Sequence, residues 1–312
     1  MVRFRRVLVI FVIIALIAGA VAYYFIFRGL EGAVSIAGVE LYVKPSDVSE
    51  FQTPIEVHVN VENRFPAGVR IEGGNLVVML SDLKIANVAV PAQDVGRGQT
   101  TLVVNAILDN TLLDDFWYRH LSHGERSNMS IEGSIIINTF IGSLKLPLSF
   151  SNIVETRVFP IIQELNREYE MAVLGKVIVR KVMVELIKVT PYETNLKATV
   201  TIENGLRVVP LYLSGLVFNL RTCGGILLGS GEQEIPKSIV PGEVDTVVFN
   251  VTINNSKIPK LWVEHVRNRE KTMINLEVWL KIEVAGRKLE IFKEHPLTAS
   301  TELRTSIFKY EE

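Results

Sequence analysis

Two stretches of this 312-residue sequence repeat each other in the same order. Residues 59–63 resemble residues 200–204 at an offset of 141, and Gly74 matches Gly215 at the same offset. Further matches follow at offsets of 145 and then 149: residues 101–105 with 246–250, Phe116-Trp117 and His120 with Leu261-Trp262 and His265, residues 130–132 with 275–277, and Thr156 and Phe159 with Thr305 and Phe308. Because the order never breaks, the chain is predicted to hold two copies of one domain.

Each copy has the pattern of β-structure. Short segments rich in Val, Ile and Leu alternate with turn residues, which favours an antiparallel sandwich. The predicted strands are residues 55–61, 76–80, 101–108 and 130–137 in the first copy, and 196–202, 216–220, 246–253, 275–284 and 288–292 in the second. Predicted turns lie at residues 66–68, 73–74, 96–98 and 141–143. The predicted fold is all-β, with two tandem immunoglobulin- or fibronectin-like sandwiches.

One short helix is predicted in each copy. Asn110 is the expected N-cap of the first, and an apolar stripe follows it at helical spacing. The stripe comprises Leu113, Phe116, Trp117 and Leu121 in the first copy and Ile258, Leu261, Trp262 and Val266 in the second. A stripe kept in both copies is expected to cover an open end or face of the sandwich.

The predicted domain organisation has four parts. Residues 1–29 form a cytoplasmic stub and a transmembrane helix, 30–159 the first sandwich, 160–175 a connector and 176–312 the second sandwich. The connector, bounded by Pro160 and Gly175, has no counterpart after the second copy. Proline favours a helix start and glycine a helix end, so a short helical or irregular segment is expected.

Residues 7–27 contain no charged side chain. At ~1.5 Å per residue this run spans ~30 Å, the hydrocarbon thickness of a bilayer. Arg3, Arg5 and Arg6 precede it, whereas Arg28 and Glu31 nearly cancel after it. The positive-inside rule predicts a single-pass protein of the cell membrane, with a cytoplasmic N-terminus and both sandwiches outside the cytoplasm. A cleaved signal peptide ending at residues 20–22 (Ala-Val-Ala) is the alternative.

Charge and cysteine content exclude other classes of protein. The net charge is −1, and the four arginines near the apolar run carry +4, so the remainder carries −5. An acidic body without a basic stripe argues against nucleic acid as a partner. The single cysteine, Cys223, excludes an intrachain disulfide.

No catalytic or metal site can be assembled from the sequence. His120 and His123 lie near Asp114, Asp115 and Glu125, but the second copy keeps only His265 and replaces the acidic pair with Pro259 and Lys260. We therefore expect packed histidines, no metal and no cofactor. Cys223 lacks a base beyond the neighbouring Arg221 to activate it. The glycines at 224–225 and 229–231 predict a turn, since no phosphate-loop lysine follows.

Each copy resembles the late embryogenesis abundant type-2 family, also called the WHy (water stress and hypersensitive response) domain. The resemblance rests on the Asn63 and Asn204 turns, the Gly74 and Gly215 strands, the threonine-led strand before a short helix, the strand at Leu146-Pro147, and the terminal Thr156 and Thr305. It covers roughly residues 35–159 and 177–308. It implies a seven-stranded sandwich with one helix, a role in stress tolerance, an N-terminal membrane anchor as in many plant members, and no catalytic residues.

The sequence thus predicts a membrane-anchored, non-enzymatic, stress-associated binding or protective protein. Two alternatives stay open: a module that binds or transfers lipid or another hydrophobic ligand, and a structural protein that pairs exposed strand edges with a cell-envelope partner. The candidate ligand groove lies between each helix and its sandwich. Its residues are Phe116, Trp117, Leu121, Leu261, Trp262 and Val266. An apolar tunnel there would favour lipid binding, and a tightly packed, dry interface would favour the other functions.

Overall fold

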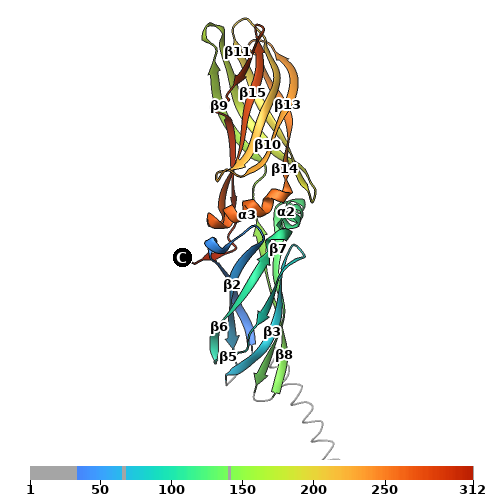
Figure 1. The fold of residues 1–312 in the computed structure, drawn as a ribbon, viewed down its shortest axis with the longest axis vertical. Helices are drawn as coiled ribbons and strands as arrows, with labels where there is room; N and C mark the ends of the chain where they lie inside the picture. The colour runs from blue at the N-terminus through green and yellow to red at the C-terminus, as the bar shows by residue number, and fades with distance from the viewer. Residues whose placement is uncertain (1–33, 65–67, 140–141, 312) are drawn as a thin grey trace, which may run out of the picture.

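The computed structural model describes residues 34–64, 68–139 and 142–311. They form two elongated lobes stacked end to end, with the helices α2 and α3 at the junction (Figure 1). The predicted membrane anchor at residues 7–27 lies outside the described residues. Within them, no helix is both long and apolar enough to cross a bilayer.

The first lobe contains two sheets. One has the order β18-β1-β2-β6, and the other has the order β4-β3-β7-β8 with β5 paired to β3. Their strands are β1 (Val34–Val43), β2 (Gln52–Asn63), β3 (Val69–Leu80), β4 (Leu83–Val90), β5 (Gln93–Val95), β6 (Gly98–Asp109), β7 (Arg126–Thr139), β8 (Gly142–Glu155) and, from the C-terminal end of the chain, β18 (Lys309–Tyr310).

The second lobe repeats this arrangement. One sheet has the order β14-β11-β10-β9, and the other has the order β13-β12-β15-β16 with β17 paired to β15. The strands are β9 (Ile161–Glu170), β10 (Gly175–Val189), β11 (Glu193–Leu206), β12 (Leu211–Thr222), β13 (Leu227–Ile239), β14 (Val244–Asn254), β15 (Lys271–Val284), β16 (Arg287–Ile291) and β17 (Leu297–Arg304).

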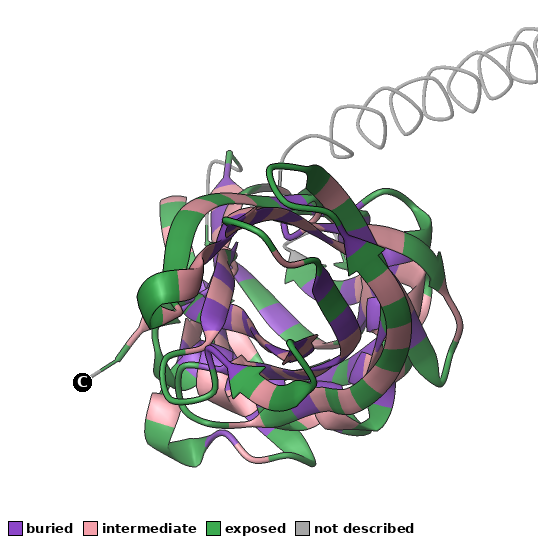
Figure 2. Ribbon diagram, turned by 90° about the horizontal axis from the view of Figure 1, so that it is seen from above, coloured by how far each residue is buried: buried purple, intermediate pink, exposed green. Residues whose placement is uncertain are grey.

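Alternating side chains fill a separate core in each lobe. Every second residue of β2 and β11 is buried, as expected for strands with one face on a core. Seen along the long axis, bands of buried, intermediate and exposed residues alternate along the curled strands (Figure 2). The prediction of an all-β chain with two short helices is confirmed, and the paired sheets are consistent with sandwiches.

The two lobes match in register as well as in order. Ile36 pairs with Val61 in the first lobe, as Val179 pairs with Ile202 in the second. Immediately after these pairs both ladders skip one residue, Ala37 in β1 and Arg180 in β10. A bulge repeated at one position means that β1 and β10 are equivalent strands.

Two predicted features of the backbone are wrong. Residues 73–74, predicted as a turn, lie inside β3 beside a register shift, where a Cβ on Gly74 would stand 2.7 Å from the Ser134 carbonyl oxygen. Residues 229–231 lie inside β13, so only residues 224–225 form the predicted turn. At these positions the lack of a side chain lets neighbouring strands approach closely, and the chain does not reverse direction. The turn predicted at 96–98 joins β5 to β6, whereas those at 66–68 and 141–143 fall partly outside the described residues.

The connector prediction is also wrong for most of its length. Ile161–Glu170 forms β9, which pairs antiparallel with β10 and so belongs to the second lobe. Only a single 3-10 turn at Ala172–Leu174 separates it from β10. Ile161, Leu165 and Tyr169 pack on the second core. Their spacing of four residues fits one face of a strand, on which every second side chain points the same way, as well as one face of a helix.

Candidate interdomain site

The two helices lie between the lobes and contact each other. They are α2 (Leu113–Ser122) and α3 (Ile258–Arg267), each preceded by a 3-10 turn, Asn110–Leu112 or Asn255–Lys257. The side chain of Asp109, not the predicted Asn110, caps the first turn by accepting from the Thr111 N–H at 3.0 Å. Asn254 does the same for the Ser256 N–H.

Each helix contributes to the core of the other lobe. Leu113, Trp117 and Leu121 of α2 belong to the hydrophobic core of the second lobe. Val266 of α3 belongs to the core of the first lobe, with Trp262 packed beside it. Ile258 and Leu261 of α3 belong to the core of their own lobe. The stripe of α2 is therefore buried mainly against the other copy, whereas the stripe of α3 is divided between the two lobes.

Hydrogen bonds cross the junction in matching pairs. The Trp117 indole N–H donates to the Thr194 hydroxyl at 3.0 Å, and the Trp262 indole N–H donates to the Thr53 hydroxyl at 2.9 Å. Both threonines are fully buried. Because each tryptophan of one copy bonds the same position of the other, the interface has the reciprocal pattern of a two-fold dimer within one chain.

A buried asparagine supports each of these threonines. Thr53 donates to Asn110 Oδ1 at 3.0 Å, and Thr194 donates to Asn255 Oδ1 at 2.9 Å. The Asn110 amide donates to the Ser49 carbonyl at 2.7 Å and the Asn255 amide to the Thr190 carbonyl at 2.8 Å. These contacts satisfy polar groups that have no access to water, and so fix the tryptophan positions.

The chain segments that leave the two copies also cross the junction. After the first copy, Val158 and Ile161 enter the core of the second lobe, and β9 then runs along β10. After the second copy, Phe308 enters the core of the first lobe, and β18 pairs with Tyr42 and Val43 of β1. Each copy thus sends its last segment to the first strand of the other.

A buried glutamate holds each crossing segment. The Glu125 carboxylate accepts from the Thr156 hydroxyl at 2.7 Å and from the backbone N–H groups of Val158 and Phe159 at 2.6 and 2.8 Å. Glu270 makes the same three contacts in the second copy, with the Thr305 hydroxyl and the backbone N–H groups of Ile307 and Phe308. Both glutamates have left-handed backbones, φ +61° and +60°. A non-glycine residue in this region is strained, and these charge-assisted bonds offset the strain.

A buried histidine completes each network. His120 Nε2 lies 2.9 Å from the Thr156 hydroxyl, and its Nδ1 lies 2.8 Å from the Ser127 hydroxyl. His265 is placed likewise between Thr305 and Thr272. Burial lowers the pKa of His120 to about 4, against an opposing effect of Glu125. Burial also lowers the pKa of His265 to about 4. Both imidazoles are therefore neutral at neutral pH.

The direction of these hydrogen bonds does not activate the hydroxyl. Thr156 has one proton, which it donates to Glu125, so His120 Nε2–H donates to Thr156 rather than accepting from it. A nucleophilic triad needs the imidazole to take the hydroxyl proton. The buried group therefore has the geometry of a structural clamp.

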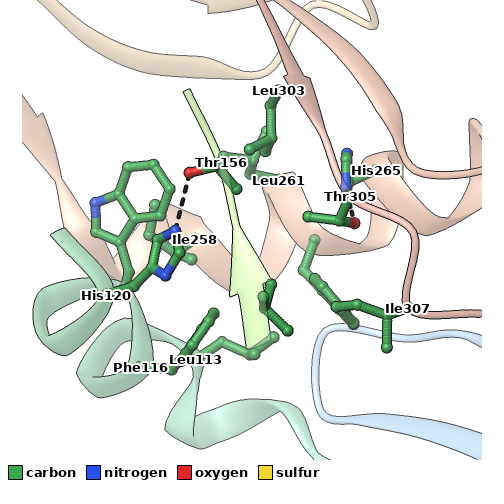
Figure 3. Close-up of a pocket in the computed structure, with 13 residues that line it drawn as sticks. Leu113, Phe116, His120, Thr156, Ile258, Leu261, His265, Leu303, Thr305 and Ile307 are labelled. Atoms are coloured by element: carbon green, nitrogen blue, oxygen red, sulfur yellow. Dashed lines mark hydrogen bonds between the residues drawn. The ribbon is translucent and has the colours of Figure 1, made fainter. Parts of the chain in front are cut away.

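A small cavity lies on the axis between the copies. It measures about 50 Å³ and is lined by equivalent residues of both, including His120 and His265 with their bonded threonines (Figure 3). Of the predicted groove residues, Phe116, Trp117, Leu261 and Trp262 line this cavity, whereas Leu121 and Val266 are buried outside it. An apolar cavity of about 150 Å³ holds a benzene molecule, and ligand pockets commonly exceed about 300 Å³.

The other candidate residues do not converge. His123 is exposed and bonds the Arg119 carbonyl, so it lies apart from the His120 network. Exposed Cys223 lies 3.5 Å from a Glu264 oxygen. In the part of the chain that the structure describes, no three His, Cys, Asp or Glu side chains are placed to hold a metal ion.

The repeat in the sequence matches His120 with His265 and Thr156 with Thr305, but it predicts no joint role for them. The pairing of Glu125 with Glu270 was not predicted, although they too are separated by 145 residues. A comparison of the two copies for identical polar residues 145 positions apart would have found them, because buried polar groups need specific partners and so tend to be kept in both copies.

No protein-family model matches the chain, and no curated protein sequence matches it. Among solved structures, a protein from Archaeoglobus fulgidus is similar at 25% identity with a TM-score of 0.37, covering 42% of this chain and 99% of its own. A protein from Arabidopsis thaliana is similar at 14% identity with a TM-score of 0.30, covering 39% of this chain and 80% of its own. Both matches are at low identity and cover less than half of this chain.

A longer match involves a β-glucuronidase of glycoside hydrolase family 2, at 9% identity and a TM-score of 0.25. It covers 85% of this chain, which spans 25% of that enzyme.

Proposed function

We propose that this chain is a non-enzymatic, membrane-tethered binding protein in which two immunoglobulin- or fibronectin-like sandwiches act as one rigid unit. The observation that carries the proposal is the reciprocal junction, where Trp117 and Trp262 bond Thr194 and Thr53 of the opposite copy. The apolar stripes are used in joining the lobes, so binding falls to the outer surfaces. The resemblance to the late embryogenesis abundant type-2 family connects this role with water stress.

The dimensions of the junction disfavour the lipid alternative. A cavity of about 50 Å³ is about a third of the ~150 Å³ that holds a benzene molecule, and an acyl chain is larger still. The surrounding side chains are fixed by buried hydrogen bonds, so opening a tunnel would break them.

Lipid analysis tests this part of the proposal. The full chain is extracted in detergent, and the lipids that co-purify are quantified by mass spectrometry against a membrane protein purified in the same way. We expect no lipid above that background. One lipid bound per chain, lost in the variant Trp117→Ala/Trp262→Ala, would contradict the proposal and favour a lipid-binding module.

Drying experiments test the protective role. A labile soluble enzyme is dried and rehydrated with the full chain in liposomes, and its remaining activity is compared with that in empty liposomes plus an equal mass of serum albumin. Greater recovery with the full chain supports protection by surface binding. Recovery equal to the albumin control would restrict the proposal to the binding of specific partners.

A further inference from the structure

The two lobes differ at one sheet edge. In the second lobe, β9 pairs with eight residues of β10 between Lys176 and Val184. In the first lobe, the equivalent strand β1 pairs on that side with β18 alone, at Tyr42 and Val43. Among the described residues, the stretch from Val34 to Leu41 therefore pairs along its backbone with β2 alone, although the Glu40 side chain forms an ion pair with Lys309 of β18.

The uncovered edge leaves apolar side chains partly exposed. Val39 occupies the position of Val182 in the repeat, but Val182 is fully buried whereas Val39 is only half-buried. β8 lies against β1 here, and its Leu146 and Phe150 are also only partly covered. In the second lobe β9 lies against β17, and Ile291 and Ala299, which occupy the positions of Leu146 and Phe150, are both 0% exposed.

The two edges also differ in how they are protected against pairing. β9, the outer strand of the second lobe, has four charged residues among ten: Glu164, Arg167, Glu168 and Glu170. β1 has one, Glu40, and Lys309 already neutralises it by an ion pair. Proteins commonly place charged side chains on open sheet edges to prevent pairing with other strands. Since the only charge of β1 is already neutralised, we expect another strand to cover this edge.

We propose that the β1 edge of the first lobe binds an extended segment of another protein, which adds a strand antiparallel to β1 as β9 does to β10. This proposal rests on the proposed binding function and names its site. Main-chain hydrogen bonds along Val34 to Leu41 supply the affinity, and a segment of eight residues spans ~26 Å at ~3.3 Å per residue. Apolar side chains on the segment cover Val39, Leu146 and Phe150.

A second copy of this chain fits the edge poorly. Two β1 strands paired antiparallel would place the two residues 34 at opposite ends of the ladder, with the preceding residues leading in opposite directions. The predicted anchors at residues 7–27 would then enter different membranes. A different protein carries no such restriction.

The β9 sequence itself supplies a probe. A fluorescently labelled peptide of residues 160–170 is titrated into the full chain in detergent, and its anisotropy is measured. Because the chain's own β9 is covalently linked and already pairs with β10, the free peptide cannot compete for that strand. The β1 edge is the equivalent site that remains open to it. We expect saturable binding and slowing of hydrogen exchange of the outward amides of Val34 to Leu41 by about tenfold or more.

Two matched substitutions localise the peptide. Val39→Lys places an ammonium group where the added strand must pack, and we expect it to weaken binding by about tenfold or more. The control Ile162→Lys is made in β9 of the full chain, at a side chain that is 56% exposed. It should leave the affinity of the full chain for the peptide within about twofold of the wild-type value.

Three results would overturn the proposal: no saturable binding up to about 1 mM peptide, equal weakening by both substitutions, or β1 amides as protected as those of β10 without peptide. Self-association of the full chain that Val39→Lys abolishes would also overturn it, in favour of a second copy. None of these results depends on lipid content or drying, so the inference can fail while the proposed function stands.

Discussion

The buried histidine pair makes the stability of the molecule dependent on pH in a defined direction. His120 and His265 are 2% and 1% exposed, and burial lowers the pKa of each to about 4 from its ordinary value of 6.5. As the pH falls below 6.5, these two histidines become protonated in the unfolded chain, whereas in the folded chain they stay neutral until about pH 4. Stability is therefore complete above pH 6.5 and falls as the pH decreases through this window.

The size of the effect follows from the two pKa values. Between about pH 7.5 and about pH 5, each histidine is expected to remove about 2 kcal/mol from the free energy of unfolding, and the pair about 4 kcal/mol. For a domain stable by 5–15 kcal/mol in the usual range, that is a large fraction. Because both imidazoles sit at the junction, loosening of the interface is expected first.

Urea unfolding of the full chain in detergent, followed by tryptophan fluorescence at the two pH values, measures this loss. In the variant His120→Gln/His265→Gln, glutamine can still donate to each threonine but does not titrate, so most of the loss should disappear. His123→Gln, a change at an exposed histidine, should leave the loss unchanged. The reasoning is refuted if the double variant loses as much stability as the wild type between these pH values.

Four further substitutions test the junction. Trp262→Phe removes the hydrogen bond to Thr53 and should lower the free energy of unfolding by about 1–2 kcal/mol, and Trp117→Phe should lower it by a similar amount. If the interface opens as a unit, the double variant should lose less stability in thermal unfolding than the two single variants lose together. Glu125→Gln removes the charge that holds the crossing segment, so hydrogen exchange at Val158 and Phe159 should accelerate, while Ile307 and Phe308, held by Glu270, stay protected. Asn255→Ala leaves Thr194 without its acceptor and should cost about 1–3 kcal/mol in urea unfolding, whereas replacing exposed Asn250 should cost less than about 0.5 kcal/mol.

The strands and helices were predictable because burial on one face gives a direct periodic signal. Residues 55–61 and 196–202 alternate with a period of two, and both lie inside strands of the structure. The stripe from Leu113 to Leu121 has helical spacing and lies in α2. In these segments local pattern and tertiary environment agree, so the pattern alone was sufficient.

The partner of each apolar face was not predictable. A stripe indicates that Trp117 is buried but carries no information on which sandwich buries it. β9 was not predicted because Pro160 and Gly175 bound this segment as they bound a helix, and the spacing of its apolar residues fits one face of a strand or of a helix. Glu125 and Glu270 had no periodic signal at all, because a single charged residue at a left-handed position is defined by its hydrogen bonds.

The differences between the copies follow from the reciprocal junction they share. In a dimer of identical chains, a change at one side of the interface would occur at both; after duplication within one chain, each side can change alone. The shared parts of the junction, such as the Thr53 and Thr194 pair, are those that both lobes need to stay joined. The crossing segments differ instead: one extends along β10 as a charged strand, and the other, among the described residues, pairs with two residues of β1. If β1 binds a partner strand as proposed, the sealed lobe supplies stability and the lobe with the apolar edge supplies attachment, two tasks that identical copies would have to combine on the same strand.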